Sequence, residues 1–200
     1  MLKACLYYIQ QHGTQTEYGG IGMKKMSTFK LVITALFAAL ICVATMLIQI
    51  PIPATGGYAN LGDGIILICA FLMPPAYAVM AAGLGSALAD ILAGYVSYAP
   101  ATLVIKAGVA LIAALIFSKI GKDKNTRSIL AVMIVAGIPT EVFMVLGYFF
   151  YEAVILGYGL GATGAIIGNI GQGAVGIIVG CIIAPVLRKS PDVIELMNRM

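Results

Sequence analysis

Charge is scarce in this sequence, and so are the residues on which many catalytic and metal centres are built. Only 10% of the 200 residues are charged, tryptophan is absent, and the single histidine is His12 near the N-terminus. A histidine-based catalytic or metal centre in the apolar part of the chain is therefore excluded. The four cysteines, Cys5, Cys42, Cys69 and Cys181, have no CxxC spacing and are typical of small core residues.

Apolar residues are abundant instead. They make up 61% of the chain, and the mean hydropathy is +1.02. An ordinary soluble domain does not reach this value, because its surface would be apolar too. Unbroken apolar runs such as 31–50 favour membrane helices over the alternating strands of a barrel. The prediction is an all-α integral membrane protein.

Six transmembrane helices are expected, separated by short loops. Their predicted ranges are 27–50, 62–73, 75–93, 101–118, 128–151 and 162–187. The first ends at Pro51-Ile52-Pro53, because proline lacks an amide donor and restricts the residue before it. The second is short for a crossing and is counted as a tilted or shielded span. We expect a membrane domain over 23–189 and a cytoplasmic tail over 190–200.

Basic residues gather in three places along the chain. They are Lys3, Lys24, Lys25 and Lys30 before the first helix, Lys119, Lys122, Lys124 and Arg127 in one loop, and Arg188, Lys189 and Arg199 after the last helix. With six crossings all three groups lie on one face, which predicts that both termini are cytoplasmic. The expected location is a bacterial cell membrane, with multiple passes through the lipid bilayer. Because the basic groups are short and border membrane spans, no nucleic-acid partner is expected.

Residues 1–22 differ from the rest and have no apolar segment of signal-peptide length. Gly19 and Gly20 can be encoded by a ribosome-binding sequence a short distance before Met23. We therefore hypothesise that this N-terminal extension reflects a misassigned start and that Met23 is the first residue. Terminal sequencing of the native protein tests this, and an intact Met1 peptide would exclude it.

Ionisable residues inside a membrane are costly and usually face a bundle interior or a cavity. Helix rise places Asp90 and Lys106 at similar depths below the outer surface, so they can meet. Glu141 lies near mid-membrane, with Tyr148 and Glu152 on the same face of its helix and nearer the exterior.

Further polar residues lie at the same outer side. Asn169 and Gln172 are neighbours in the outer half of the last helix, Tyr58, Asn60 and Asp63 border the first outer loop, and Tyr95 and Tyr98 border the second. This convergence predicts a polar pocket opening outward. The predicted substrate-binding residues are Tyr58, Asn60, Asp90, Tyr98, Lys106, Glu141, Tyr148, Asn169 and Gln172.

Structural roles compete with ligand binding for these residues. An Asp90–Lys106 pair can simply join two helices, Asn169 and Gln172 can hydrogen-bond between helices, and the tyrosines can be interfacial anchors. Small residues form a second pattern: Ala35 and Ala39 make an AxxxA step, and the last helix carries two GxxxG steps. These steps permit close helix approach without identifying the partner.

Three segments resemble motifs of a known family: 57–63 (GYANLGD), 83–90 (GLGSALAD) and 98–106 (YAPATLVIK). They are similar to the substrate-specific S component of energy-coupling factor (ECF) vitamin transporters, and the similarity covers 26–189. Within that family the chain most resembles the branch that includes hydroxymethylpyrimidine and pyridoxine transporters, often labelled riboflavin-type.

The resemblance implies an S-component fold that binds a vitamin from outside. It also implies docking on a membrane coupling subunit driven by two ATPases, followed by toppling to release substrate inward. Ala35 and Ala39 match the family's docking surface. No catalytic residue, cofactor or metal site is predicted. A hydroxymethylated pyridine or pyrimidine suits the pocket residues, and the absence of tryptophan argues mildly against riboflavin.

Three other functions remain open at this point. One is a solitary carrier coupled to protons through Glu141. Another is a membrane enzyme that uses Asp63, Asp90 and Glu141 as acid–base groups, although no nucleophile motif accompanies them. The third is a structural assembly subunit whose polar groups pair among themselves.

Overall fold

A computed structural model of the chain describes residues 28–120 and 126–200. The predicted N-terminal extension, the hypothesised start at Met23 and the lysines at 3, 24, 25, 122 and 124 lie outside these ranges.

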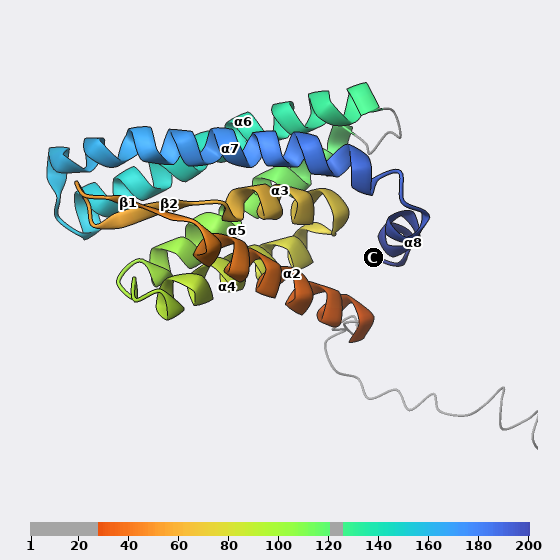
Figure 1. Cartoon of the computed structure of the whole chain (residues 1–200), viewed down its shortest axis with the longest axis horizontal. Helices are drawn as coiled ribbons and strands as arrows, with labels where there is room; N and C mark the ends of the chain where they lie inside the picture. Colours follow the sequence, from red (N-terminus) through yellow and green to blue (C-terminus); the bar gives the residue numbers. More distant parts are fainter. Residues whose placement is uncertain (1–27, 121–125) are drawn as a thin grey trace, which may run out of the picture.

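The described chain is mostly helical (Figure 1). The long helices are α2 (Thr28–Leu47), α4 (Pro75–Leu92), α5 (Ala99–Ile120), α6 (Thr126–Phe150) and α7 (Thr163–Leu187). A π-helical turn, Tyr151–Ile155, extends α6, and a short 3-10 helix, Gly159–Ala162, precedes α7. By length and composition, these five long helices can each cross a membrane.

The segment after α2 departs from the all-α prediction. The first helix ends at Leu47 rather than residue 50, and the chain forms an antiparallel hairpin of β1 (Gln49–Ile52) and β2 (Gly57–Asn60). Pro51 pairs with Tyr58 in this hairpin. A two-stranded ribbon tolerates proline at an edge, where the missing amide breaks no second ladder. The turn uses Gly56, whose φ of 68° suits a residue without a side chain.

Helix α3 (Gly62–Leu72) follows the hairpin directly and is enclosed by other helices. It has only 11 residues, and every one except Ile65 is buried. Asp63 lies in its first turn, where the helix dipole favours a carboxylate. Pro74 and Pro75 separate it from α4, as the sequence predicts.

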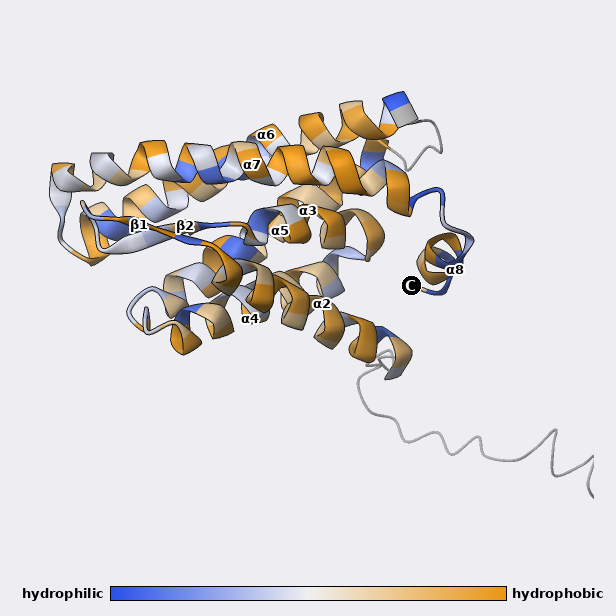
Figure 2. Ribbon diagram, viewed as in Figure 1, coloured by the Kyte–Doolittle hydropathy of each residue, from blue (hydrophilic) through white to orange (hydrophobic). Residues whose placement is uncertain are grey.

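The long helices consist mostly of hydrophobic residues (Figure 2), and their exposed and buried side chains are distributed opposite to those of a soluble protein. Large apolar side chains are exposed along the outer faces of α2, α6 and α7, for example Val43, Val142 and Ile182. The buried residues include Asp63, Asp90 and Lys106. Such a surface is stable only in lipid, which fits a membrane protein with a polar interior.

The two ends of the bundle differ. The β-hairpin and the connections α4–α5 and α6–α7 lie together at one end, whereas the starts of α2 and α6 lie at the other with α8 (Pro191–Arg199) (Figure 1). Helix α8 occupies the predicted tail. It folds back toward α2, where the Arg199 guanidinium lies 3.9 Å from the Phe29 ring centroid.

Close approach of α2 and α4 depends on Gly85. A Cβ at this position would lie 2.5 Å from the carbonyl oxygen of Ala38. We expect Gly85→Ala to destabilise the fold by about 1–3 kcal/mol, because backbone must move to make room. The matched control is Gly171→Ala, since no atom lies within 4 Å of a Cβ there. Thermal unfolding in detergent measures both, and equal melting temperatures would contradict the prediction.

Candidate functional site

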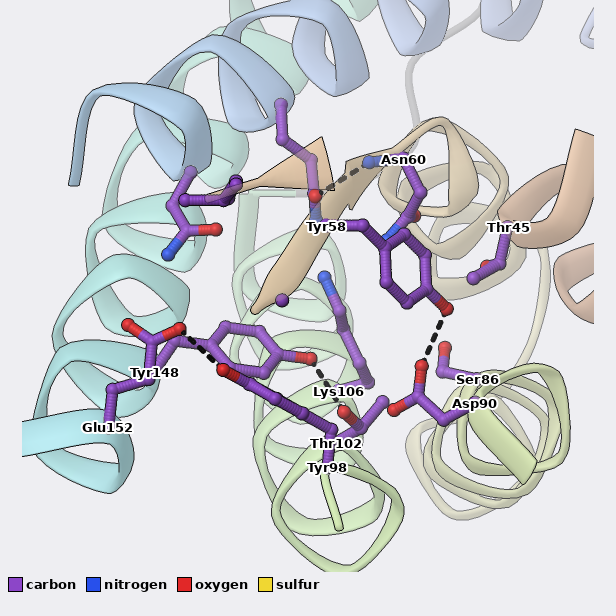
Figure 3. Close-up of a pocket in the computed structure, with 14 residues that line it drawn as sticks. Thr45, Tyr58, Asn60, Ser86, Asp90, Tyr98, Thr102, Lys106, Tyr148 and Glu152 are labelled. Atoms are coloured by element: carbon purple, nitrogen blue, oxygen red, sulfur yellow. Dashed lines mark hydrogen bonds between the residues drawn. The ribbon is translucent and has the colours of Figure 1, made fainter. Parts of the chain in front are cut away.

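A polar cavity lies at the hairpin end of the bundle, between β2, α4, α5, α7 and the π-helical turn after α6 (Figure 3). Eight of the nine predicted site residues line it: Tyr58, Asn60, Asp90, Tyr98, Lys106, Tyr148, Asn169 and Gln172. The fold thus brings together residues that are more than 100 positions apart in sequence. Their role toward a ligand remains a prediction.

Glu141 lies elsewhere. Its side chain lines an apolar groove of about 310 Å³ on the outer side of α6 and α7, with Ile138, Val142 and Ile170. It is 6% exposed, and neither carboxyl oxygen has a hydrogen-bond partner in the described chain. Helix periodicity predicts it on the same face as Tyr148, but in the structure its side chain packs against α7, where a Cβ at Gly173 would lie 2.8 Å from the Glu141 Cβ.

Other lining residues are absent from the predicted set. Thr45, Ser86, Thr102 and Glu152 line the cavity, and Asp63 lies behind Lys106. Glu152 and Asp63 carry a usable signal, because both are carboxylates next to apolar runs. The small hydroxyl residues carry none, since membrane helices commonly contain serine and threonine whose side chains bond to their own backbone.

The inner wall of the cavity is an ion pair with an extended hydrogen-bond network. The Lys106 ammonium lies 2.6 Å from Asp63 Oδ1, and both side chains are almost fully buried. The amide of Gln172 donates to the other oxygen of Asp63. Gln172 Oε1 in turn accepts from the backbone N–H of Asn60 at 2.8 Å. The network joins α3, α5, α7 and the hairpin.

The predicted Asp90–Lys106 pair does not form. Lys106 bonds to Asp63, whereas Asp90 accepts a hydrogen bond from Tyr58 at 2.6 Å. Helix α3, which has only 11 residues and carries Asp63 in its first turn, supplies the partner of Lys106.

Tyrosine hydroxyls close the outer wall. Tyr98 shares its single hydroxyl hydrogen between the Thr55 carbonyl at 2.9 Å and Glu152 at 3.2 Å. The Tyr148 and Thr102 hydroxyls are 2.9 Å apart. Burial raises the pKa of Tyr98 above its usual range. This phenol is therefore protonated at neutral pH and acts as a donor.

The cavity is nearly closed. Its free volume is about 20 Å³, which is roughly the room that one water molecule needs. Tyr58 covers it from the hairpin, and its ring packs on Tyr95 with centroids 4.4 Å apart. Tyr98 meets the hairpin at Gly57, where a Cβ would lie 3.1 Å from its hydroxyl. A ring-sized ligand can enter only if the hairpin or these tyrosines move.

The residues that the structure describes contain no cluster of three or more histidine, cysteine, aspartate or glutamate side chains able to hold a metal ion. The donor set of the cavity is suited to hydrogen bonding and stacking of an organic molecule.

Two comparisons with known proteins give matches. A family model described as "ECF-type riboflavin transporter, S component" matches residues 25–189. A protein of Pyrococcus woesei that bears the name "Uncharacterized protein in gap 3'region" is 42% identical over 149 residues, which cover 74% of this chain and 95% of that protein.

The buried ion pair yields a prediction on stability. Asp63→Asn or Lys106→Met alone should destabilise the protein by about 3–5 kcal/mol, because each leaves an uncompensated buried charge. The double variant should recover much of that loss. Thermal unfolding of the wild type, the two single variants and the double variant gives a double-mutant cycle. If the loss of stability in the double variant equals the sum of the two single losses, the two side chains are not coupled.

Proposed function

This chain belongs to the family of ECF-type riboflavin transporter S components, and from that premise we propose that it captures a small water-soluble vitamin or vitamin precursor outside the cell for ATP-driven uptake. The family is one of transporter components, not enzymes. The cavity is the observation that carries the proposal: a polar, aromatic-lined space inside a bundle whose surface is apolar.

Pyridoxine or hydroxymethylpyrimidine is the proposed substrate class, with riboflavin as the alternative. Tyr58, Tyr98 and Tyr148 offer ring faces for a heterocycle. Asn169 offers both an amide donor and an acceptor, which suits a ring nitrogen with a neighbouring hydroxyl.

The proposed topology has six crossings and cytoplasmic termini. Helix α3 is too short to cross alone, and we count it as a span together with β2, which leads into it from the cavity end. The basic residues at the far end support the orientation, because Lys30, Lys119, Arg127, Arg188 and Lys189 border the helix ends there. The cavity then faces outward. The compartment is a cell membrane, and its bacterial origin remains a prediction.

The proposed partners are a membrane coupling subunit and two ATPase subunits. Ala35 and Ala39 are the proposed docking residues on α2. Both are exposed, and they lie among exposed apolar residues such as Val32, Leu36 and Val43. A flat strip of small side chains within an apolar face allows a partner helix to approach closely.

One observation favours a second candidate, a solitary proton-coupled carrier. Glu141 is a buried carboxyl without a hydrogen-bond partner in the described residues, and it borders the apolar groove between α6 and α7. Intramembrane carboxyls of this kind serve as proton relays in some transporters. Uptake into vesicles that contain neither ATP nor partner subunits would favour this candidate.

The capture function is tested by purification from cells grown in rich medium, mass spectrometry of any retained molecule and titration of the emptied protein. We expect a pyridine, pyrimidine or flavin that binds tightly. Asn169→Ala should weaken its binding by about 1–3 kcal/mol, because a buried hydrogen bond is lost. No binding across a vitamin panel would contradict the proposal.

The docking surface is tested separately. Ala35→Leu and Ala39→Leu should leave ligand affinity unchanged, because both positions are on the outer face of α2 and away from the cavity. They should strongly reduce ATP-driven uptake by vesicles that contain the whole transporter. Ala131→Leu, at an exposed position of α6, serves as the control for a larger apolar side chain outside this face. Loss of ligand affinity in the alanine variants would instead make α2 part of the pocket.

A further inference from the structure

We propose that the cavity selects a neutral or cationic ring compound with hydrogen-bond donors at two separate positions, and that it rejects the phosphorylated form of the same compound. Asp90 and Glu152 make this selection from different walls of the cavity. The inference rests on the proposed capture function and adds to it the charge of the substrate and a specificity residue, Glu152, outside the predicted set.

Asp90 and Glu152 have the same pattern of hydrogen bonds. One oxygen of Asp90 accepts from Tyr58, and one oxygen of Glu152 accepts from Tyr98. The second oxygen of each, Oδ2 and Oε2, is buried and has no hydrogen-bond partner in the described part of the chain. Asp90 is 3% exposed and Glu152 is 2% exposed, and both line the cavity. A buried carboxylate oxygen without a donor is costly, so a ligand that supplies donors at both positions gains from each.

Most other polar groups of the cavity are already engaged. Gln172 uses both ends of its amide, toward Asp63 and toward the backbone of Asn60. The Asn60 side chain accepts from Gly62, and the single hydroxyl hydrogens of Tyr58 and Tyr98 are committed to acceptors. The strongest open positions are therefore the two carboxylate oxygens, which can only accept when ionised.

The charge around the cavity points the same way. Among the described residues, Lys106 is the one basic side chain in the lining, and it is bound to Asp63. Asp90 and Glu152 have no basic partner within ion-pair distance among the same residues. A phosphate or carboxylate brought into this space would lie beside two acidic side chains and would find no free cation in the described lining, which disfavours its binding.

A local irregularity of the backbone sets the position of Glu152. The residue lies in the π-helical turn Tyr151–Ile155 at the end of α6. π-Helical turns shift the following side chains relative to a regular helix and occur often at functional sites. The turn buries Glu152 beside Tyr98, while the neighbouring Val154 and Ile155 stay exposed to lipid.

The test uses the full chain in detergent and three pairs of probes: pyridoxine, hydroxymethylpyrimidine and riboflavin, each with its phosphate ester. We expect one of the three unphosphorylated compounds to bind. Its phosphate ester should bind roughly 100-fold or more weakly, because the phosphate would lie beside the acidic side chains of Asp90 and Glu152. Pyridoxamine, which carries a cationic amine, should bind at least as tightly as pyridoxine if the pyridoxine pair is the one recognised.

Isosteric variants separate charge from size. Asp90→Asn and Glu152→Gln keep the oxygen that accepts from tyrosine and replace the free oxygen by an amide donor. Each should weaken binding of the unphosphorylated compound by about 10-fold or more, because a hydrogen bond to the carboxyl oxygen is lost. Each should also reduce the ratio of the Kd of the ester to the Kd of the unphosphorylated compound. If size alone excludes the ester, the ratio will not change. Glu195→Gln, an exposed carboxylate on α8, is the matched control and should change neither value.

The outcomes are distinct. Equal binding of the unphosphorylated compound and its ester, or an unchanged ratio in both variants, overturns the selection while leaving capture intact. Absence of binding by every probe overturns the capture function and this inference together. Melting temperatures verify that the variants are folded, and Glu152→Gln alone is sufficient if Asp90→Asn does not fold.

Discussion

The ion pair between Lys106 and Asp63 is the interaction on which the rest of the structure depends. Moving two charges from water into a lipid-embedded bundle is expensive, and the cost is recovered only with close geometry and further hydrogen bonds. Here the Lys106 ammonium reaches Asp63 at 2.6 Å, and Gln172 donates to the second carboxylate oxygen. Because these groups come from α5, α3 and α7, satisfying the charge fixes three helices relative to one another.

The hairpin is held by the same network. Gln172 accepts from the backbone of Asn60, so β2 is connected to the ion pair through one amide side chain. Glycines on α7 allow the hairpin to pack closely against this helix. A Cβ at Gly168 would lie only 2.9 Å from the side chain of Ile52 in β1. The hairpin brings Tyr58 over the cavity and leaves about 20 Å³ of free space beneath it. Entry of the proposed ligand therefore requires that the hairpin or the tyrosine side chains over the cavity move.

The two ends of the bundle have separate tasks in the proposed cycle. Capture takes place at the hairpin end, where buried acceptors and tyrosine rings are concentrated. The outer face of α2 carries exposed small and apolar residues and has no part in the cavity lining, to which this helix contributes only the buried Thr45. The family to which the chain belongs is one of transporter components.

The sequence by itself determined that the chain is a helical membrane protein, and the apolar runs located the five long helices within a few residues. It also brought eight cavity residues into one set, because helix rise and periodicity fix depth and face when both ends of a span are known. Only the tertiary structure decided the Asp63–Lys106 pairing, the packing of Glu141 against α7, the β-hairpin and the π-helical turn at Glu152. These features depend on contacts between segments far apart in the sequence, or on a local change in helical hydrogen bonding, and a hydropathy pattern encodes neither.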